Sequence, residues 1–461
     1  MIISVIGSGG KTTKIKQLKD QYLKEGKSVL MTTSTHMKIE EKTLVDPSYE
    51  EIINEIKKHG YVHAGGKAKN QKIKALDDEV LERLKKEIDV ILIEADGSHR
   101  LPLKYPRNHE PAVDKDSNEI ILITSLKGLG KPVQDVVHGY QEMKIDGNQK
   151  VDSLFIQQLI NIYLEKIKKY NVPIKIQVNG ASSLYEKALA SLLENQKEVT
   201  LIDEEWFLPQ PKLVILGAGH VSQYVSKLAS MLDFYTIVID ERKEFACKEL
   251  FPEANEIHCV SFDKADSYFP KEANTCYVIV TRGHKDDRLC LKKTLFRQSL
   301  YVGMIGSKKK VRQTYDALLE EGYQQVELDK VHAPIGLSIK AVTPAEIAVS
   351  IMSEIIAIKN EHQYSSITSD LLEVQGDGVL CIIIDKKGST PRTVGSMMFV
   401  NEKGIIGSIG GGREEYQAIL DANNCHQVMM KHYELNNSES ANLGMICGGS
   451  NDVLFLPIKQ H

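Results

Sequence analysis

Residues 2–13 read IISVIGSGGKTT, an apolar run that ends in a glycine-rich turn and the triplet Lys-Thr-Thr. The run predicts a buried strand, and Ile15, Leu18 and Tyr22 mark the apolar face of a helix that follows it. A glycine-rich turn between a strand and a helix lets backbone N–H groups converge on phosphate oxygens at the positive end of the helix. This stretch therefore predicts an α/β domain built around a phosphate-binding loop.

The same loop predicts a nucleotide site with Mg²⁺. Lys11 would reach the terminal phosphates, and the hydroxyl of Thr12 would ligate Mg²⁺. The spacing is shorter than the Walker A pattern, whose first glycine would fall at Val5, and a turn without a ligand is the alternative. We expect either ATP or GTP here. The predicted nucleotide-binding residues are Gly7, Gly9, Gly10, Lys11, Thr12 and Thr13.

Two acidic residues follow a later apolar run at residues 90–93. Glu94 and Asp96 come where the carboxyl end of a parallel strand would place a carboxylate near Mg²⁺ or its water. The sequence does not choose between them, and a solvated turn is the alternative. The predicted metal ligands are Thr12, Glu94 and Asp96.

Further along the chain, short apolar strands alternate with amphipathic helices, which predicts a mostly parallel sheet covered on both faces. Residues 209–211 read Pro-Gln-Pro and indicate a linker, after which a second βαβ pattern runs to a helix with Thr343 as its N-cap. The last segment combines a strand, a hairpin, a helix and two more strands. We expect an N-terminal parallel-sheet domain with a P-loop (1–208), a central Rossmann-like domain (209–360) and a small α+β domain (376–461).

A second glycine-rich turn, residues 217–222, follows the first strand of the central segment. It is similar to a dinucleotide-binding turn, although Ser222 replaces the third glycine, and Asp240 ends the next strand where an acidic residue would bind a ribose hydroxyl. A Rossmann-like fold without a ligand is the alternative. Residues 306–308, Gly-Ser-Lys, follow a later strand and predict an anion nest; the alternative is that the lysine triplet at 308–310 is a solvated helix start. The predicted cofactor-binding residues here are Gly217, Gly219, His220, Asp240, Gly306 and Ser307.

The C-terminal segment holds three glycine-rich loops, at residues 388–392, 407–412 and 444–449. They indicate a site lined by backbone for an anion or a cofactor. Cys447 would be accessible there and would approach a metal or sulfur centre as a thiolate, the alternative being a small buried side chain. We predict Cys447 as the catalytic residue. The predicted cofactor-binding residues are Gly388, Ser389, Arg392, Gly410, Gly411 and Gly412.

The composition is that of a globular protein. Of the 461 residues, 58 are Lys or Arg and 62 are Asp or Glu, and the net charge of −4 argues against a dedicated nucleic-acid binder or a polybasic membrane-surface protein. No apolar run approaches the roughly 18 residues of a membrane span, and the first residues lack the features of a signal peptide. Seven widely spaced cysteines without a Cys-x-x-Cys motif argue against a disulfide framework. We therefore expect a cytoplasmic protein.

The central segment resembles the Rossmann domain of the XdhC family, the xanthine dehydrogenase accessory factors. The stretches that carry this resemblance are residues 239–242 with 245–246, 303–307, 332–337 and 343–351. The last segment resembles the CoxI-like part of that family, which normally precedes the Rossmann domain. Its matching stretches are residues 388–392, 410–412 and 447–449.

Residues 1–205 resemble the YqeC family, found with selenium-dependent molybdenum hydroxylases, through residues 7–13 and 94–98. Together the resemblances imply a maturation factor that binds molybdenum cofactor (molybdopterin), protects it during sulfuration or selenation, and delivers it to an apo-enzyme. The implied partners are an apo molybdenum hydroxylase and a sulfur- or selenium-donating enzyme. A homodimer stays open, and we expect no partnership with nucleic acid or membrane.

Two other functions stay open. The central domain would suit an NAD-dependent oxidoreductase, although the substituted third glycine and the lack of an adjacent catalytic pair count against this. A P-loop kinase or nucleotidyltransferase acting on the cofactor is the other, and transfer of phosphoryl groups from labelled ATP would reveal it.

Overall fold

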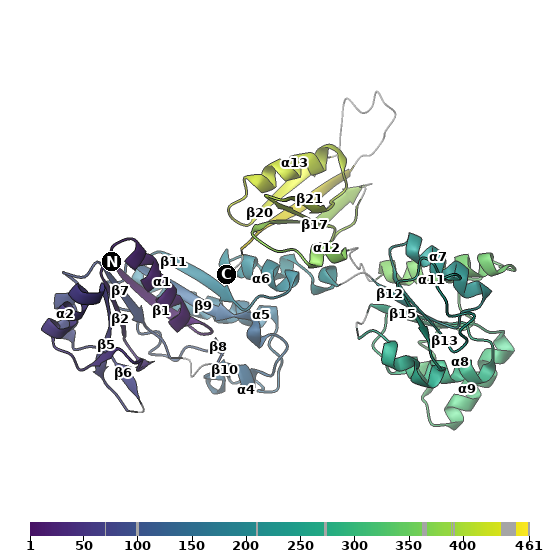
Figure 1. The fold of residues 1–461 in the computed structure, drawn as a ribbon, viewed down its shortest axis with the longest axis horizontal. Helices are drawn as coiled ribbons and strands as arrows, with labels where there is room; N and C mark the ends of the chain where they lie inside the picture. Colours follow the sequence, from purple (N-terminus) through teal and green to yellow (C-terminus); the bar gives the residue numbers. More distant parts are fainter. Residues whose placement is uncertain are drawn as a thin grey trace.

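The computed structural model describes the whole chain except residues 70, 98–100, 209–210, 272–273, 362–366, 389, 391, 435–448 and 460–461. Within the described residues, three main sheets follow one another along the sequence (Figure 1). This order confirms the expected α/β class, with a parallel-sheet part, then a Rossmann-like part, then a small α+β part. Most of the linker predicted at 209–211 lies outside the described residues.

The N-terminal sheet has the order β11-β9-β1-β7-β2-β5-β6-β3, and β4 pairs with β5. Strands β11 to β5 run parallel, whereas β6 lies antiparallel to both β5 and β3. The strands are β1 (Ile2–Gly7), β2 (Val29–Thr33), β3 (His36–Lys38), β4 (Thr43–Val45), β5 (Tyr61–Lys67), β6 (Lys72–Lys74), β7 (Val90–Glu94), β9 (Glu119–Ser125) and β11 (Ile174–Asn179). A separate parallel pair is formed by β8 (Leu103–Lys104) and β10 (Val137–His138). The helices are α1 (Lys11–Lys24), α2 (Tyr49–His59), α3 (Asp78–Leu84), α4 (Val133–Val136), α5 (Ser153–Ile167) and α6 (Leu184–Glu194).

The side chains of β1 alternate between the two faces of this sheet. Ile3 and Val5 pack in a cluster with Ile15 of α1. Ile2 and Ile6 pack in another cluster, with the buried side of α5. Both faces are therefore covered, which explains why these strands read as nearly continuous apolar runs.

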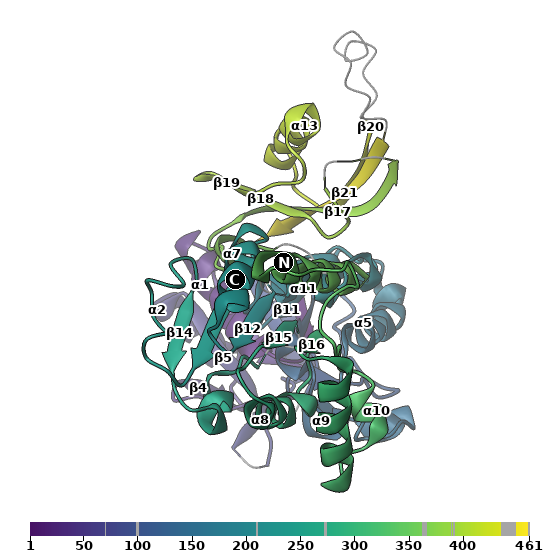
Figure 2. The same cartoon turned by 90° about the vertical axis from the view of Figure 1, so that its right-hand side faces the viewer.

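The central sheet has the order β14-β13-β12-β15-β16, and its strands are all parallel. The helices α7 and α11 cover one face, and α8 and α9 cover the other (Figure 2). The predicted capping of α11 is confirmed, because the Glu346 N–H donates to Thr343 Oγ1 (3.2 Å) and the Thr343 N–H donates to Glu346 Oε2 (3.0 Å). The elements are β12 (Lys212–Leu216), α7 (His220–Met231), β13 (Tyr235–Asp240), β14 (Glu256–Cys259), β15 (Thr275–Ile279), α8 (His284–Leu295), β16 (Tyr301–Met304), α9 (Lys308–Glu320), α10 (Gln325–Leu328) and α11 (Pro344–Glu361).

The C-terminal sheet is antiparallel, with the order β19-β18-β17-β21-β20. Cys381 and Ile383 of β17 pack toward Ala418 of α13. Leu380 of β17 and Leu456 of β21 instead share an apolar cluster with the N-terminal part of the chain, and β21 lies against α6 (Figure 1). The elements are α12 (Ser369–Leu372), β17 (Gly378–Gly388), β18 (Met397–Asn401), β19 (Gly404–Gly407), α13 (Gly412–Asn423), β20 (Met429–Glu434) and β21 (Gly449–Ile458).

Candidate functional site

The first glycine loop, residues 7–13, joins β1 to α1 at the carboxyl edge of the N-terminal sheet. Gly7 and Gly10 have φ values of +87° and +143°, which favour glycine. A Cβ atom at Gly7 would lie 2.0 Å from the carbonyl oxygen of Ile123, and one at Gly10 would lie 2.4 Å from Asn179 Nδ2. The neighbouring strands β9 and β11 therefore press so closely on the loop that only glycine fits at these two positions.

Lys11 opens α1 and folds back over the loop. Its Nζ donates to the carbonyl oxygen of Gly7 (2.7 Å), and its side chain is 4% exposed while still lining the cavity described below. Burial lowers the pKa of Lys11, against the opposite effect of the Glu94 and Asp96 carboxylates. A buried ammonium attracts an incoming anion strongly, because little water remains between the two charges to screen them.

Thr12 and Glu94 meet across the edge of the sheet. Thr12 Oγ1 donates to Glu94 Oε2 (3.1 Å), since β7 pairs directly with β1 and ends beside the start of α1. Burial raises the pKa of Glu94, although Lys11 and Thr12 favour its ionised form. A hydroxyl and a carboxylate placed together at this edge are the ligand pair with which P-loop proteins hold Mg²⁺.

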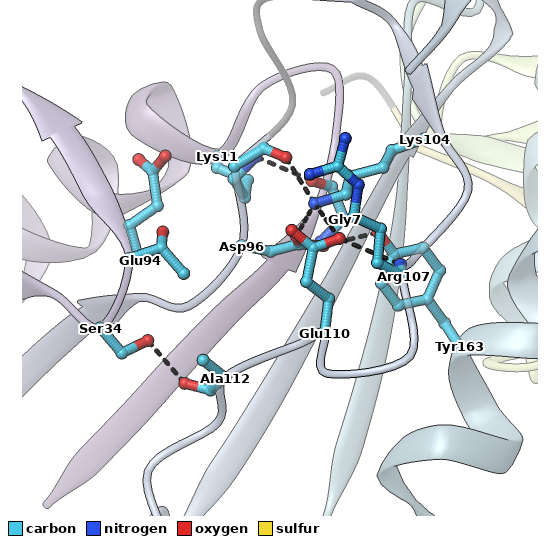
Figure 3. A network of polar contacts seen from close by, with 12 residues as sticks. Gly7, Lys11, Ser34, Glu94, Asp96, Lys104, Arg107, Glu110, Ala112 and Tyr163 are labelled. Carbon is cyan, nitrogen blue, oxygen red and sulfur yellow. Dashed lines mark hydrogen bonds and ion pairs between the residues drawn. The ribbon is translucent and has the colours of Figure 1, made fainter. Parts of the chain in front are cut away.

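Asp96 has different surroundings. Its side chain is fully buried, and Asp96 Oδ2 accepts from Tyr163 OH (2.5 Å) and from the Gly7 N–H (3.2 Å), while Oδ1 pairs with Lys104 Nζ. Lys104 Nζ also contacts Glu110 Oε2 (2.8 Å). In Figure 3 the Glu94 side chain stands apart from this network. Asp96 thus stabilises the start of the first glycine loop through the hydrogen bond from the Gly7 N–H.

Sequence reasoning missed Lys104, Glu110 and Tyr163, which complete this network. Burial raises the pKa of Tyr163, and the nearby Asp96 raises it further, so the phenol stays protonated and donates. Burial would raise the pKa of Glu110, but hydrogen bonds from Lys104 and the Arg107 N–H outweigh it and keep this carboxylate ionised. Lys104 lies near Asp96 and Glu110 in the sequence, but these two carboxylates lie outside helices and strands, so no helical or strand period relates them to it, and Tyr163 lies 67 positions from Asp96.

A cavity of about 2270 Å³ opens over this edge of the sheet. The first glycine loop lies on its wall, together with the ends of the neighbouring strands. Among the described residues that line it, Lys and Arg outnumber Asp and Glu by nine to four. A concave wall with this excess concentrates anions.

In the second glycine loop, residues 217–222, the polar groups are hydrogen-bonded to side chains of the protein itself. Ser222 donates from Oγ to the carbonyl oxygen of Gly217 (2.5 Å) and is fully buried beneath the loop. Asp240 is bound through both oxygens, by the Ala218 N–H (2.7 Å) and by Arg242 Nε and the Arg242 terminal nitrogen (2.9 and 2.8 Å). Burial would raise the pKa of Asp240, but these hydrogen bonds hold it below its ordinary value. A ribose hydroxyl would have to displace Arg242.

The other predicted residues of the central part lie at the starts of helices. His220 is exposed at the first position of α7, next to Gly219. Ser307 is the N-cap of α9 and accepts from the Lys310 N–H (3.3 Å), with Gly306 just before it. The Ser307 hydroxyl therefore caps the start of α9, and anion binding at these residues stays a prediction.

The C-terminal glycine loops divide into described and undescribed parts. The predicted residues Ser389 and Cys447 lie outside the described residues. Gly410 and Gly411 lie in a loop whose N–H groups are already bound: the Gly411 N–H donates to Glu415 Oε2 (3.1 Å), and the Gly410 N–H donates to Ser408 Oγ (3.2 Å).

Glu415 also accepts from the N–H of Ile409 (2.9 Å) and from Ser408 Oγ (2.6 Å). Burial would raise its pKa, but these hydrogen bonds keep it low. The loop thus binds an internal carboxylate where the sequence predicts an anion or a cofactor. Of the remaining predicted residues, Gly388 ends β17, Arg392 is exposed, and Gly412 is the first residue of α13.

Two features are absent from the residues that the structure describes. In that part of the chain, no group of three or more His, Cys, Asp or Glu side chains is arranged to hold a metal ion. None of the helices described is both long and apolar enough to cross a membrane.

Comparison with known proteins finds three family matches along the chain. Residues 3–141 match the YqeC protein family, residues 213–355 match the XdhC Rossmann domain, and residues 371–433 match the XdhC and CoxI family. These matches confirm the resemblances predicted from the sequence.

Curated relatives match shorter stretches. YqeB of Escherichia coli is 34% identical over 33% of this chain and 28% of its own length. YqeC of the same organism is 34% identical over 31% of this chain and 58% of its own length. A protein of Bacillus subtilis, named as a probable xanthine dehydrogenase subunit, is 30% identical over 32% of this chain and 43% of its own length. The chain therefore spans less than two thirds of each of these relatives.

Among solved structures, a xanthine dehydrogenase from Bacillus halodurans is 30% identical to this chain, with a TM-score of 0.31, over 36% of this chain and 47% of the other. Segments similar to the YqeC family, to the XdhC Rossmann domain and to the XdhC and CoxI family follow one another in this order along the chain.

Proposed function

We propose that this protein is an accessory factor for a molybdenum hydroxylase of the xanthine dehydrogenase type, and that its N-terminal cavity binds ATP or GTP with Mg²⁺. The XdhC and CoxI matches and the B. subtilis relative support the accessory role. The observation that carries the nucleotide site is the contact between Thr12 and Glu94 beside the buried Lys11, on the wall of a basic cavity.

The residues of the first glycine loop fit a nucleoside triphosphate. Lys11 would exchange its contact with the Gly7 carbonyl oxygen for the terminal phosphates, and the loop N–H groups would bind the inner ones. Thr12 and Glu94 would hold Mg²⁺, which neutralises phosphate charge when bound. Asp96, paired with Lys104, accepts from the Gly7 N–H and so would hold the start of the loop in place.

The turn at residues 409–411 does not fit the phosphate of molybdenum cofactor, because Glu415 and Ser408 already accept from its N–H groups. Gly388 and Arg392 lie outside this turn and remain proposed cofactor-binding residues. Cys447 remains the proposed group for contact with molybdenum or with a transferred sulfur or selenium. An apo hydroxylase and a sulfur- or selenium-donating enzyme remain the proposed partners.

Titration calorimetry of the full chain with ATP or GTP and Mg²⁺ tests the nucleotide site. Lys11→Ala should weaken binding about 10- to 100-fold, since a charge-assisted hydrogen bond contributes about 1.5–3 kcal/mol. Lys14→Ala is the matched control, because Lys14 also lines the cavity on α1 but follows the loop. Equal affinities of the two variants for nucleotide would contradict the site.

Anaerobic co-purification with molybdopterin tests the accessory role separately. The wild-type chain should retain the cofactor, and Cys447→Ala should retain less than Cys425→Ala, which alters a buried cysteine of the same part. Absence of molybdopterin from the wild-type preparation would argue against the accessory role and leave the nucleotide site unaffected.

A further inference from the structure

The β3–β6 ribbon, made of residues 36–38 and 72–74, forms a basic edge of the N-terminal sheet. Met37 and Ile73 oppose each other and are buried, at 4% and 0% exposure. Because side chains alternate along a strand, the pairs on either side of them face the opposite way. These pairs are His36 with Lys74 and Lys38 with Lys72, and all four residues line the cavity, as does Met37.

This face of the ribbon places like charges directly opposite each other. Lys38 and Lys72 form one cross-strand pair, and such pairs destabilise a sheet. Among the described residues, the ion pairs found do not include Lys38, Lys72 or Lys74, and the nearby Glu40 is already paired with Lys16 (2.6 Å). The repulsion would be relieved by an anion held between these lysines.

The cavity has room for such an anion beside a nucleotide. Sites for small ligands usually occupy about 300–1,000 Å³, whereas this cavity holds about 2270 Å³. The ribbon begins just after β2, where the Ser34 N–H donates to the carbonyl oxygen of Glu94 (3.2 Å). A ligand on the ribbon would therefore lie on the β2 side of phosphates bound at the first glycine loop.

We propose that the β3–β6 ribbon binds a second anionic ligand, a small molecule that carries a phosphate group. Lysine ammonium groups bind phosphate as point charges, and the concave wall favours a small molecule over a polymer. The overall charge of −4 likewise argues against nucleic acid. This inference rests on the proposed function only for the position of the nucleotide, which would lie beside the second ligand in the same cavity.

Calorimetry with inorganic pyrophosphate as the probe tests the ribbon. The full chain is first saturated with the ATP analogue AMP-PNP and excess Mg²⁺, so that pyrophosphate cannot take the first glycine loop. The variant Lys38→Gln with Lys72→Gln should bind pyrophosphate about tenfold more weakly and AMP-PNP as before. Lys57→Gln with Lys58→Gln is the matched control, because it removes the same charge from exposed positions of α2.

The outcomes separate the two proposals. Loss of pyrophosphate binding in the ribbon variant but not in the control supports the second site. Equal weakening in both variants, or no pyrophosphate binding once AMP-PNP is bound, overturns it. If AMP-PNP does not bind to the wild-type chain while pyrophosphate binding still depends on the ribbon, the nucleotide site fails and the ribbon site stands.

Discussion

The hydroxyl of Thr12 donates a hydrogen bond to the carboxylate of Glu94 at 3.1 Å, although 82 positions separate the two residues in the chain. This contact distinguishes two carboxylates that the sequence left equivalent. Glu94 faces the start of α1 and the cavity, whereas Asp96 is enclosed by Lys104, Tyr163 and the Gly7 N–H. The same short turn thus supplies a proposed metal ligand and a structural brace.

Substitution of Glu94 should separate metal binding from folding. Glu94→Gln removes the charge that would hold Mg²⁺ but keeps the acceptor for Thr12, so we expect the Mg²⁺-dependent part of ATP affinity to fall about tenfold or more. Calorimetry with and without Mg²⁺ measures this difference. Unchanged Mg²⁺ dependence in the variant would remove Glu94 from the metal site.

Substitution of Asp96 should instead affect stability. Asp96→Asn leaves the buried Lys104 without its main counter-charge, and breaking such a pair costs about 3–5 kcal/mol. Urea unfolding measures the free energy of unfolding. The double variant Asp96→Asn with Lys104→Met should recover part of this loss, because it no longer leaves a buried ammonium; a double variant that is still less stable would contradict the pairing.

The pH dependence of Mg²⁺ binding should reflect the raised pKa of Glu94. Mg²⁺ binds the ionised carboxylate, so protons compete with it, and affinity should decline as the pH falls through a pKa above the ordinary glutamate value of 4.5. The decline should therefore begin at a higher pH than an exposed glutamate would give. In Glu94→Gln the profile of Mg²⁺ affinity against pH should be flatter, and identical profiles would exclude this residue as the titrating group.

Gly10 should tolerate no side chain. Gly10→Ala would place a Cβ atom 2.4 Å from Asn179 Nδ2 at a φ of +143°, so the loop must shift away from β11 and nucleotide affinity should drop at least about tenfold. Gly26→Ala is the control, since its φ is +76° but no atom lies within 4 Å of its added Cβ. The control should lose about 1 kcal/mol of stability and keep its nucleotide affinity.

The shared core of the N-terminal and C-terminal sheets should appear in thermal unfolding. Leu456→Ala opens a cavity in the cluster that includes α6, whereas Val453→Ala opens one on the α13 side. We expect the first to lower the unfolding temperature of the part that ATP stabilises, at a cost of about 2–5 kcal/mol, and the second to leave it nearly unchanged. If neither variant shifts the unfolding of that part in calorimetry, the two sheets do not share a core.

Two hydrogen bonds support the same contact between the sheets. Lys187 Nζ of α6 donates to the carbonyl oxygen of Val374 (3.3 Å), and the Val428 N–H donates to Asn195 Oδ1 just after α6 (3.4 Å). The sequence predicts the strands of both sheets, but it contains no local sign that one face of the C-terminal sheet would pack on a helix so much earlier in the chain.

The predicted site residues differ in how well the neighbouring sequence could indicate their positions and roles. The first glycine loop was predictable residue by residue, because turn glycines, a helix start and a following lysine are all consecutive. Asp240 and the Gly410–Gly411 turn are predicted from the sequence to bind a ligand. In the structure, Asp240 accepts hydrogen bonds from Arg242, and the turn donates to Glu415. Nothing in the spacing of these residues tells a bound ligand from an internal partner.

The sequence by itself determined the alternation of strands and helices along the chain, the resemblance of three segments to known families, and the position of the first glycine loop. The strands, helices and glycine loop follow from hydrophobic periodicity and turn chemistry, which act over a few neighbouring residues, whereas the resemblances rest on short motifs. Only the tertiary structure decided that Glu94 rather than Asp96 faces Thr12, that Glu415 fills the C-terminal glycine turn, and that four basic side chains of β3 and β6 face one cavity. Such contacts depend on which strands lie side by side, and strand order is set by packing of the whole sheet rather than by any short stretch of chain.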